Sequence, residues 1–177
     1  AAFGQGLSVA PLQAVMGINA LVNGGYLIPP TFMKRSESEA MAMAKRVIKT
    51  ETSDKMRYLM RLNAEIGTAK TADIKGYYVG GKTGTSEKVI NGRYAKKRVL
   101  NSFTAILPCD DPKYHVLIML DEPQALPETH GFITSGWNAV PTGGKVIARI
   151  GPLLGIEPRF DLPPSDRLIL AASRTTQ

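Results

Sequence analysis

The sequence predicts an α+β domain in which an antiparallel sheet is flanked by helices. Three stretches rich in apolar residues follow one another over residues 77–85, 99–107 and 114–120, with short connections between them. Short connections join antiparallel neighbours, because parallel strands need a long crossover. The three stretches therefore predict a meander. Apolar residues at helical spacing before and after it predict the helices.

The first helix is predicted from Pro11 to Val22. Ser8 can cap its N-terminus, and Pro11 suits a first helical turn. Asn23-Gly24-Gly25 stops the helix, since glycine tolerates the left-handed conformation that commonly ends one. Apolar residues occur nearly all round this helix, which is typical of a buried helix.

The segment between the first helix and the sheet is less regular. Residues 34–46 are charged and rich in Met and Ala, which predicts an exposed loop or a marginal helix. Val47-Ile48 is a candidate short strand. A second helix is predicted over about residues 53–66, ended by Gly67. The small and polar stretch 68–75 is interpreted as a surface loop.

Turn signals define the predicted meander. Asn91-Gly92 favours a tight hairpin turn between the first two strands. The third strand, residues 114–120, is apolar on both faces, which predicts a central strand covered on both sides. A long connection leads from it to a last helix that begins near Thr142.

Composition excludes several classes of function. The 177 residues carry a net charge of +7, which we interpret as a solvated basic surface, with an anionic polymer or lipid surface nearby as the alternative. Nucleic-acid binding is disfavoured, because the densest basic run, Lys96-Lys97-Arg98, is short and lacks interleaved stacking aromatics. A single cysteine, Cys109, excludes an internal disulfide. The two histidines lie far apart without ligands at metal-binding spacing, so neither a metal nor a cofactor is predicted.

The strongest candidate site is Lys82-Thr83-Gly84-Thr85, preceded by Gly80-Gly81. Side chains alternate along a strand, so Thr83 and Thr85 share a face and can both donate to a ligand carboxylate. Lys82 begins on the opposite face, but its long arm can curl round the edge and supply a positive potential. Gly84 leaves room for a ligand, and the Thr85 N–H can point at a carbonyl under attack. The alternative interpretation is a short string that recurs by chance.

Lys-Thr-Gly is one of three elements, with Ser-x-x-Lys and a Ser-x-Asn element of the Ser-Asp-Asn type, that mark class A β-lactamases and penicillin-binding proteins. The other two are absent from this sequence. The chain nevertheless resembles the C-terminal half of the transpeptidase domain of class B penicillin-binding proteins, above all the septal, cell-division peptidoglycan transpeptidase of Gram-negative bacteria. The segments that carry the resemblance are residues 4–13, 23–25, 80–88, 102–105 and 121–123.

The resemblance implies a partial β-lactamase/transpeptidase-like fold, with residues 1–157 as the C-terminal part of the domain and 158–177 as a Pro-rich polar tail. It implies a periplasmic parent protein, anchored by an N-terminal membrane helix, that cross-links peptidoglycan stem peptides ending in D-Ala-D-Ala through a serine acyl-enzyme. β-Lactams would trap that serine, and proteins of the division machinery would be partners. No cofactor is implied.

By resemblance, Lys82 and Thr85 are catalytic residues, and Thr83, Gly84 and Thr85 bind the substrate or antibiotic. The loop after Thr85, with Tyr94, either lines the mouth of the cleft or is a plain solvated loop. The nucleophilic serine is expected upstream of Ala1, because no serine in this sequence has a lysine three residues on. The isolated chain is therefore expected to be inactive. Because the resemblance implies that much of one helical layer comes from the upstream half, the chain is also expected to be only marginally stable or to self-associate, with a homodimer as the natural outcome. A non-catalytic binding or interaction domain with the same partial fold is the alternative, and the upstream residues would decide between the two.

Overall fold

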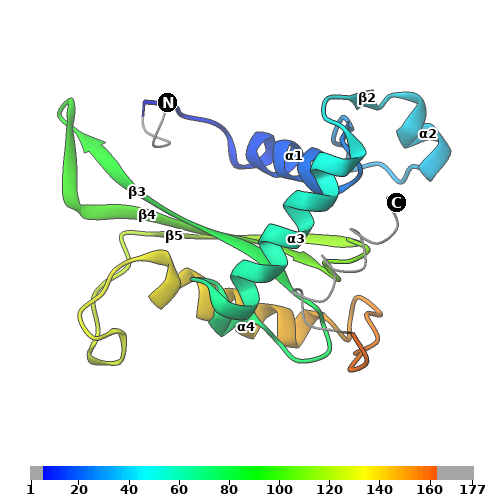
Figure 1. Ribbon diagram of the computed structural model, residues 1–177. Helices are drawn as coiled ribbons and strands as arrows, with labels where there is room; N and C mark the ends of the chain where they lie inside the picture. The colour runs from blue at the N-terminus through cyan, green and yellow to red at the C-terminus, as the bar shows by residue number, and fades with distance from the viewer. Residues whose placement is uncertain (1–5, 163–177) are drawn as a thin grey trace. The chain divides into compact units, whose positions relative to one another are not determined.

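The structure is a computed structural model that describes residues 6–162, and Figure 1 shows its elements. The chain forms two compact units, one through Leu59 and the other from Met60 onward. The helix α3 (Thr50–Ile66) contains this boundary.

The first unit pairs a helix with a very small sheet. Its further elements are α1 (Pro11–Val22), β1 (Tyr26–Leu27), α2 (Glu37–Ala42) and β2 (Lys45–Arg46). β1 and β2 pair antiparallel, and the Arg46 guanidinium lies 4.2 Å from the centre of the Tyr26 ring. Gly25 has φ +99°, and a Cβ there would stand 2.2 Å from the carbonyl oxygen of Ile48. Only glycine fits this close approach.

Two predictions for this unit are wrong in detail. The N-cap of α1 is Ala10 rather than Ser8, and the Ala10 N–H donates to the side chain of Gln13 at 3.1 Å. The short strand lies at Lys45–Arg46 rather than at Val47-Ile48. The Val47 N–H instead donates to the Gly25 carbonyl at 2.8 Å, which closes the turn beyond the paired residues. The bounds of α1 are as predicted.

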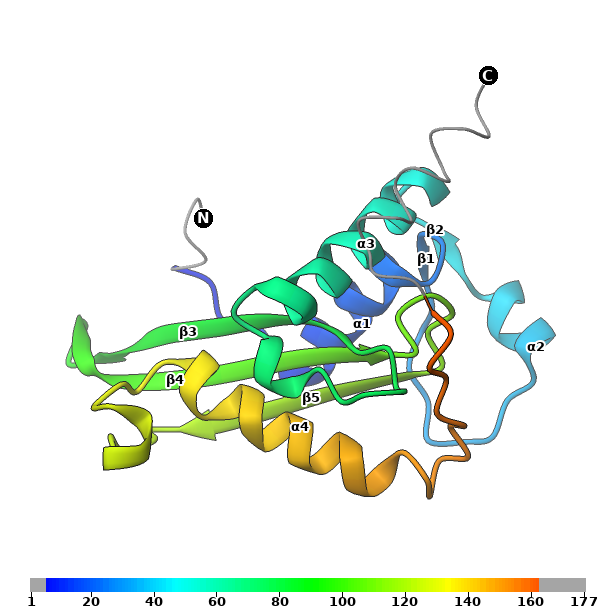
Figure 2. The same ribbon diagram turned by 60° about the horizontal axis from the view of Figure 1, so that its bottom comes forward.

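The second unit contains a three-stranded antiparallel meander in the order β3-β4-β5. The strands are β3 (Gly80–Ile90), β4 (Arg93–Leu107) and β5 (Tyr114–Asp121), and α4 (Ala139–Ile150) packs along β4 and β5, as Figure 2 shows. Within residues 60–162 the unit also has three 3-10 helices: η1 (Lys70–Ala72) precedes β3, and η2 (Pro127–Thr129) and η3 (Ser135–Trp137) lie between β5 and α4. Asn91 and Gly92 make the β3–β4 turn with φ +50° and +76°. The predicted α+β class and antiparallel sheet are confirmed.

The prediction that residues 114–120 form a central strand is wrong for the described sheet. β4 is the middle strand, and β5 pairs only with β4 among residues 6–162. The most buried stretch is accordingly on β4, where Phe103, Ala105, Ile106 and Leu107 are fully buried. In a meander of two successive hairpins, the second strand pairs with both of its neighbours and is therefore the central one. An apolar residue pattern indicates that other elements cover the two faces of a strand, but it does not indicate the order of the strands in the sheet.

Phe103 is the centre of the core between β3 and α4. A Cβ on Gly81 or on Gly143 would stand 2.5 Å from its ring, so these two glycines make room for it. Ala69 and Ala72 belong to the same core and have no exposed surface. The interpretation of residues 68–75 as a surface loop is therefore wrong, because Ala69 and Ala72 pack inward and Asp73 is only partly exposed, while the other polar residues of the segment face solvent.

Candidate functional site

The Lys-Thr-Gly-Thr segment lies on β3, which pairs with β4 alone among residues 6–162. In an antiparallel pair, the main-chain groups of alternate residues point toward the partner strand and away from it. The Gly81 carbonyl points away from β4, since it accepts a hydrogen bond from Asn63 Nδ2 at 2.8 Å. The N–H and C=O groups of Thr83 and Thr85 therefore point to the same outer edge of the sheet.

The Lys82 side chain reaches this outer edge. Lys82 is exposed, and its Nζ donates to the carbonyl oxygen of Thr83 at 2.8 Å. Its side chain leaves the strand on the face opposite the two threonines, so the arm bends round the strand. A positive charge thus lies beside the outward main chain of Thr85.

The hydroxyl groups of Thr83 and Thr85 share the other face of β3, opposite Phe103 and Asn101 in the register. The Thr85 oxygen accepts a hydrogen bond from the Ser135 N–H at 3.1 Å. Because a backbone N–H can only donate, the hydroxyl proton of Thr85 is not used in this bond. Thr85 is thus able to donate to a ligand.

A buried amide network holds the segment that carries Ser135. Asn101 is fully buried on β4 and donates to the Ile133 carbonyl at 2.6 Å and to Asn138 Oδ1 at 2.7 Å. The Ser135 hydroxyl donates to the Ser102 carbonyl at 2.7 Å. Sequence reasoning missed these residues, because they lie 16 to 53 positions after Thr85 and only the strand register brings them beside it.

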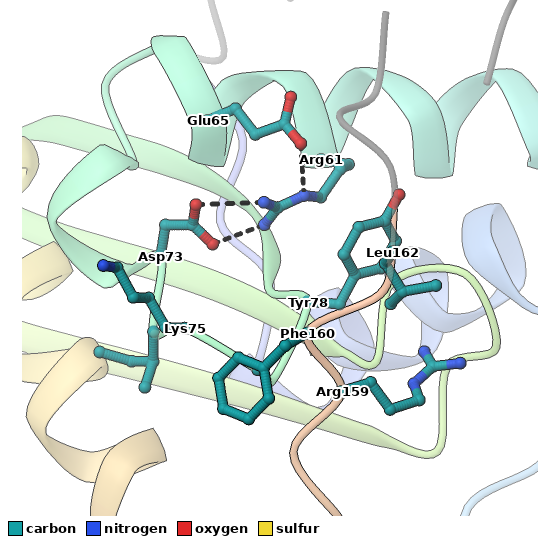
Figure 3. A pocket seen from close by; sticks show the side chains of 10 residues that line it. Arg61, Glu65, Asp73, Lys75, Tyr78, Arg159, Phe160 and Leu162 are labelled. Atoms are coloured by element: carbon teal, nitrogen blue, oxygen red, sulfur yellow. Dashed lines mark hydrogen bonds and ion pairs between the residues drawn. The ribbon is translucent and has the colours of Figure 1, made fainter. Parts of the chain in front are cut away.

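The start of β3 is held by the C-terminal turns of α3. Arg61 is only 8% exposed and donates to both carboxylate oxygens of Asp73 at 2.6 and 3.1 Å, and to Glu65 at 2.9 Å, as Figure 3 shows. It also donates to the Val79 carbonyl at 2.6 Å. Burial disfavours the charged form, but the bonds and charge of Asp73, then of Glu65, outweigh it and raise the pKa of Arg61. Arg61 and Asn63 thus bind the carbonyls of Val79, just before β3, and of Gly81, at its start.

Arg61 also borders an open cavity of about 460 Å³. Its guanidinium lies 4.6 Å from the centre of the Tyr78 ring, and burial, opposed by the charge of Arg61, raises the pKa of Tyr78 to about 12. The remaining lining residues are Glu65, Asp73, Ile74, Lys75, Gly76, Arg159, Phe160 and Leu162. Arg159 pairs with Asp110 at 2.6 Å, and Arg61 pairs with both carboxylates, so most charges of this cavity are already compensated.

Beyond Thr85 the β3–β4 hairpin is basic and exposed. Glu122 binds Lys88 at 2.8 Å and Arg98 at 2.7 Å, and these bonds, that of Arg98 first, lower the pKa of Glu122 to about 2. Lys96 and Lys97 are exposed, and 45% of Tyr94 is exposed. Glu122, directly after β5, therefore binds two basic residues of the hairpin, while Lys96 and Lys97 in the bulge opposite Glu87 and Lys88 face solvent.

The model of the penicillin-binding protein transpeptidase domain family matches residues 1–135. A probable peptidoglycan D,D-transpeptidase FtsI of Caulobacter vibrioides is 41% identical over 169 residues, 90% of this chain and 28% of that protein. The stage V sporulation protein D of Bacillus subtilis is 36% identical over 167 residues, 89% of this chain and 25% of that protein.

Solved structures give the same result. The transpeptidase domain of penicillin-binding protein 3 from Burkholderia pseudomallei superposes with a TM-score of 0.76 at 28% identity, over 90% of this chain and 46% of that one. Penicillin-binding protein 3 of Mycobacterium tuberculosis in complex with ampicillin has a TM-score of 0.71 at 26% identity, over 91% and 38%.

The chain belongs to the penicillin-binding protein transpeptidase family, and the resemblance seen in its sequence is confirmed. It spans about a quarter of the length of the two curated relatives named above. None of the helices in residues 6–162 combines the length and the apolar character that a bilayer-spanning segment needs. The same residues contain no group of three or more side chains that could hold a metal ion.

Proposed function

We propose that the full-length protein is a peptidoglycan D,D-transpeptidase of the septal type, which cross-links stem peptides ending in D-Ala-D-Ala through an acyl-enzyme on serine. β-Lactams acylate the same serine. One observation carries the proposal for this chain. The Thr85 N–H at the outer edge of β3 lies beside the Lys82 ammonium, and the two threonine hydroxyls lie together on one face of the same strand.

Each group has a distinct task in acyl transfer. The hydroxyls of Thr83 and Thr85 bind the terminal carboxylate of the substrate or of the β-lactam, and Gly84 between them leaves space for the ligand. The Thr85 N–H donates to the carbonyl oxygen that becomes negative in the transition state, which is typically worth ~10²–10³ in rate. Lys82 adds a positive potential that favours the ionised form of a nearby hydroxyl.

The nucleophilic serine and its lysine lie outside this chain in the proposed mechanism. No serine of the 177 residues is followed by lysine at the third position, so this chain supplies the Lys-Thr-Gly wall and not the nucleophile. That same observation favours the second candidate, a non-catalytic binding or interaction domain with this partial fold. The residues encoded before Ala1 discriminate between the two, since Ser-x-x-Lys followed by Ser-x-Asn would support only the enzyme.

The cellular location of the protein and its protein partners are inferred from the proposed activity. The substrate lies outside the cytoplasmic membrane, so we place the protein in the periplasm, anchored by an N-terminal helix, with division proteins as its partners. A phosphatase fused after Gln177 would be active only outside the cytoplasm. An inactive fusion in cells that produce the intact protein would contradict this placement.

Acylation of the full-length protein by a penicillin tests the proposed function. Mass spectrometry is expected to find one adduct per molecule on a serine outside residues 1–177. Lys82→Ala should slow acylation by ~10²-fold or more, the range in which positioned proton-transfer groups act. Lys96→Ala, at an exposed lysine of the hairpin, is the matched control and should have no effect. Absence of any adduct on the wild-type protein would overturn the enzyme proposal.

A further inference from the structure

We propose that Thr68 is a positioning residue for carboxylate binding: Asn63 holds its main chain, and its hydroxyl donates to the Thr83 hydroxyl so that Thr83 can donate its proton to a ligand carboxylate. This inference rests on the proposed function and extends it to two residues outside the Lys-Thr-Gly-Thr segment. Thr68 does not itself contact the ligand in this proposal. It acts through Thr83, whose oxygen lies 3.0 Å from the Thr68 oxygen.

Asn63 is fixed at both ends of its amide. Its Nδ2 donates to the Gly81 carbonyl of β3 at 2.8 Å, and its Oδ1 accepts from the Thr68 N–H at 3.1 Å and from the Thr68 hydroxyl at 3.2 Å. A Cβ on Gly67 would stand 2.2 Å from Asn63 Oδ1, so glycine at this position is what allows the amide to fold over the end of α3. The amide therefore links the end of α3, Thr68 and the strand that carries the site.

The number of hydroxyl protons limits the hydrogen bonds that the two threonines can make at one time. The Thr68 hydroxyl has one proton, and Asn63 Oδ1 can only accept. While Thr68 donates to Asn63, the contact between the two threonine oxygens needs Thr83 as its donor, and the Thr83 proton is then unavailable to a ligand. When the Thr68 hydroxyl turns to donate to Thr83, the Thr83 proton is released for the ligand.

Turning the Thr68 hydroxyl leaves no acceptor without a partner. Asn63 Oδ1 keeps the hydrogen bond from the Thr68 N–H at 3.1 Å, whichever way the hydroxyl points. A carboxylate accepts hydrogen bonds more strongly than a neutral amide oxygen, so an arriving carboxylate favours the turned arrangement. In that arrangement the bond from Thr68 to Thr83 polarises the Thr83 hydroxyl and strengthens it as a donor.

Thr85 needs no such partner. Its oxygen accepts from the backbone N–H of Ser135, which cannot exchange roles, so its proton is always available. The two threonines thus have different hydrogen-bond partners: the Thr85 oxygen accepts from a fixed main-chain N–H, whereas the Thr83 oxygen faces a Thr68 hydroxyl that can turn. Loss of the Thr68 hydroxyl should therefore weaken recognition of the carboxylate without disabling the oxyanion donor at Thr85.

The experiment compares acylation of the full-length protein by benzylpenicillin and by its methyl ester, which lacks the free carboxylate. Thr68→Val should lower the second-order acylation rate for benzylpenicillin by about 2- to 10-fold, the range expected for one hydrogen bond, and leave the ester rate unchanged. Thr68→Ser should restore the wild-type rate. Thr71→Val, an exposed threonine of the same segment that has no bond to Thr83 in residues 6–162, is the matched control.

Thr83→Val combined with Thr68→Val should be no slower than Thr83→Val alone, because Thr68 affects the carboxylate only through the Thr83 hydroxyl. Equal losses for benzylpenicillin and its ester would show a general structural effect and overturn the inference, as would an unchanged rate with both ligands. Thr68→Ala gives the same comparison where valine disturbs folding. A wild-type protein that neither ligand acylates would overturn the proposed function itself, an outcome distinct from either result for Thr68.

Discussion

Removing the Arg61 side chain tests whether the Arg61 clamp, the set of hydrogen bonds from this side chain to Glu65, Asp73 and Val79, stabilises the second unit. Arg61→Met keeps the apolar stem of the side chain and deletes four hydrogen bonds, two to Asp73, one to Glu65 and one to the Val79 carbonyl. The variant leaves two carboxylates near each other without their cation. Loss of one member of a buried ion pair is typically worth about 3–5 kcal/mol.

Exposure to solvent makes the expected loss smaller for Arg61 than for a fully buried ion pair. The Asp73 side chain is 29% exposed and that of Glu65 is 17% exposed, so water can partly replace the lost donors. We expect Arg61→Met to lower the free energy of unfolding by about 2–4 kcal/mol, which is a large part of the ~5–15 kcal/mol of an ordinary domain. The start of β3 is affected because the Val79 carbonyl, directly before this strand, loses its hydrogen bond from Arg61.

Urea denaturation of the 177-residue chain, followed by circular dichroism at one fixed protein concentration, measures this difference. Arg57→Met is the matched control on the same helix, because Arg57 pairs with Asp54 at 2.5 Å on a surface where Asp54 is 52% exposed. Exposed pairs of this kind contribute only ~0–1 kcal/mol. Equal losses for the two variants would refute the reasoning that burial makes the Arg61 clamp the stronger one.

Three further predictions concern the chain as a whole. The isolated chain should form no adduct with a penicillin, because none of its serines has the expected lysine three residues on; a stoichiometric adduct in its mass spectrum would contradict this. Burial lowers the pKa of His115 in the folded chain. As the pH falls below about 6.5, His115 therefore binds a proton in the unfolded chain before it does so in the folded chain. The free energy of unfolding should accordingly decrease from pH 7.5 to 5.5. Melting curves of His115→Gln should depend less on pH over this range, and identical slopes would exclude the histidine. The isolated chain should self-associate, since Leu7, Val9, Leu12, Phe32 and Met33 are each at least half exposed; light scattering that gives a monomer mass at every concentration would refute it.

Local features of the fold were predictable because they depend on neighbouring residues. Pro11 and the Asn23-Gly24-Gly25 stop set the bounds of α1, and Asn91-Gly92 marks the hairpin turn with its two positive φ angles. The alternation of a strand places Thr83 and Thr85 on one face, and the register agrees, since they stand opposite Phe103 and Asn101. The division of the chain at residue 157 and the catalytic roles stay predictions, and most of the predicted tail lies outside the described residues.

Features that depend on distant residues were not predictable. The apolar pattern of β5 gave no indication that it would pair on one side only in the described sheet. Ala69 and Ala72 looked like parts of a polar loop, although both are fully buried. The sequence does not mark Arg61 as a buried arginine, and only the return of the chain at Asp73 places a carboxylate in front of it.

The amino-acid sequence by itself therefore determines the family, the helices, the hairpin and the identity of the segment that carries the candidate site. Only the tertiary structure decides what stands around that segment: Asn63 and Thr68 beside Thr83, and Ser135 beside Thr85. The physical reason is one of range. Backbone preferences and the alternation of side chains act over a few residues, whereas the partner of a buried donor or acceptor is set by strand register and by packing between residues far apart in the chain.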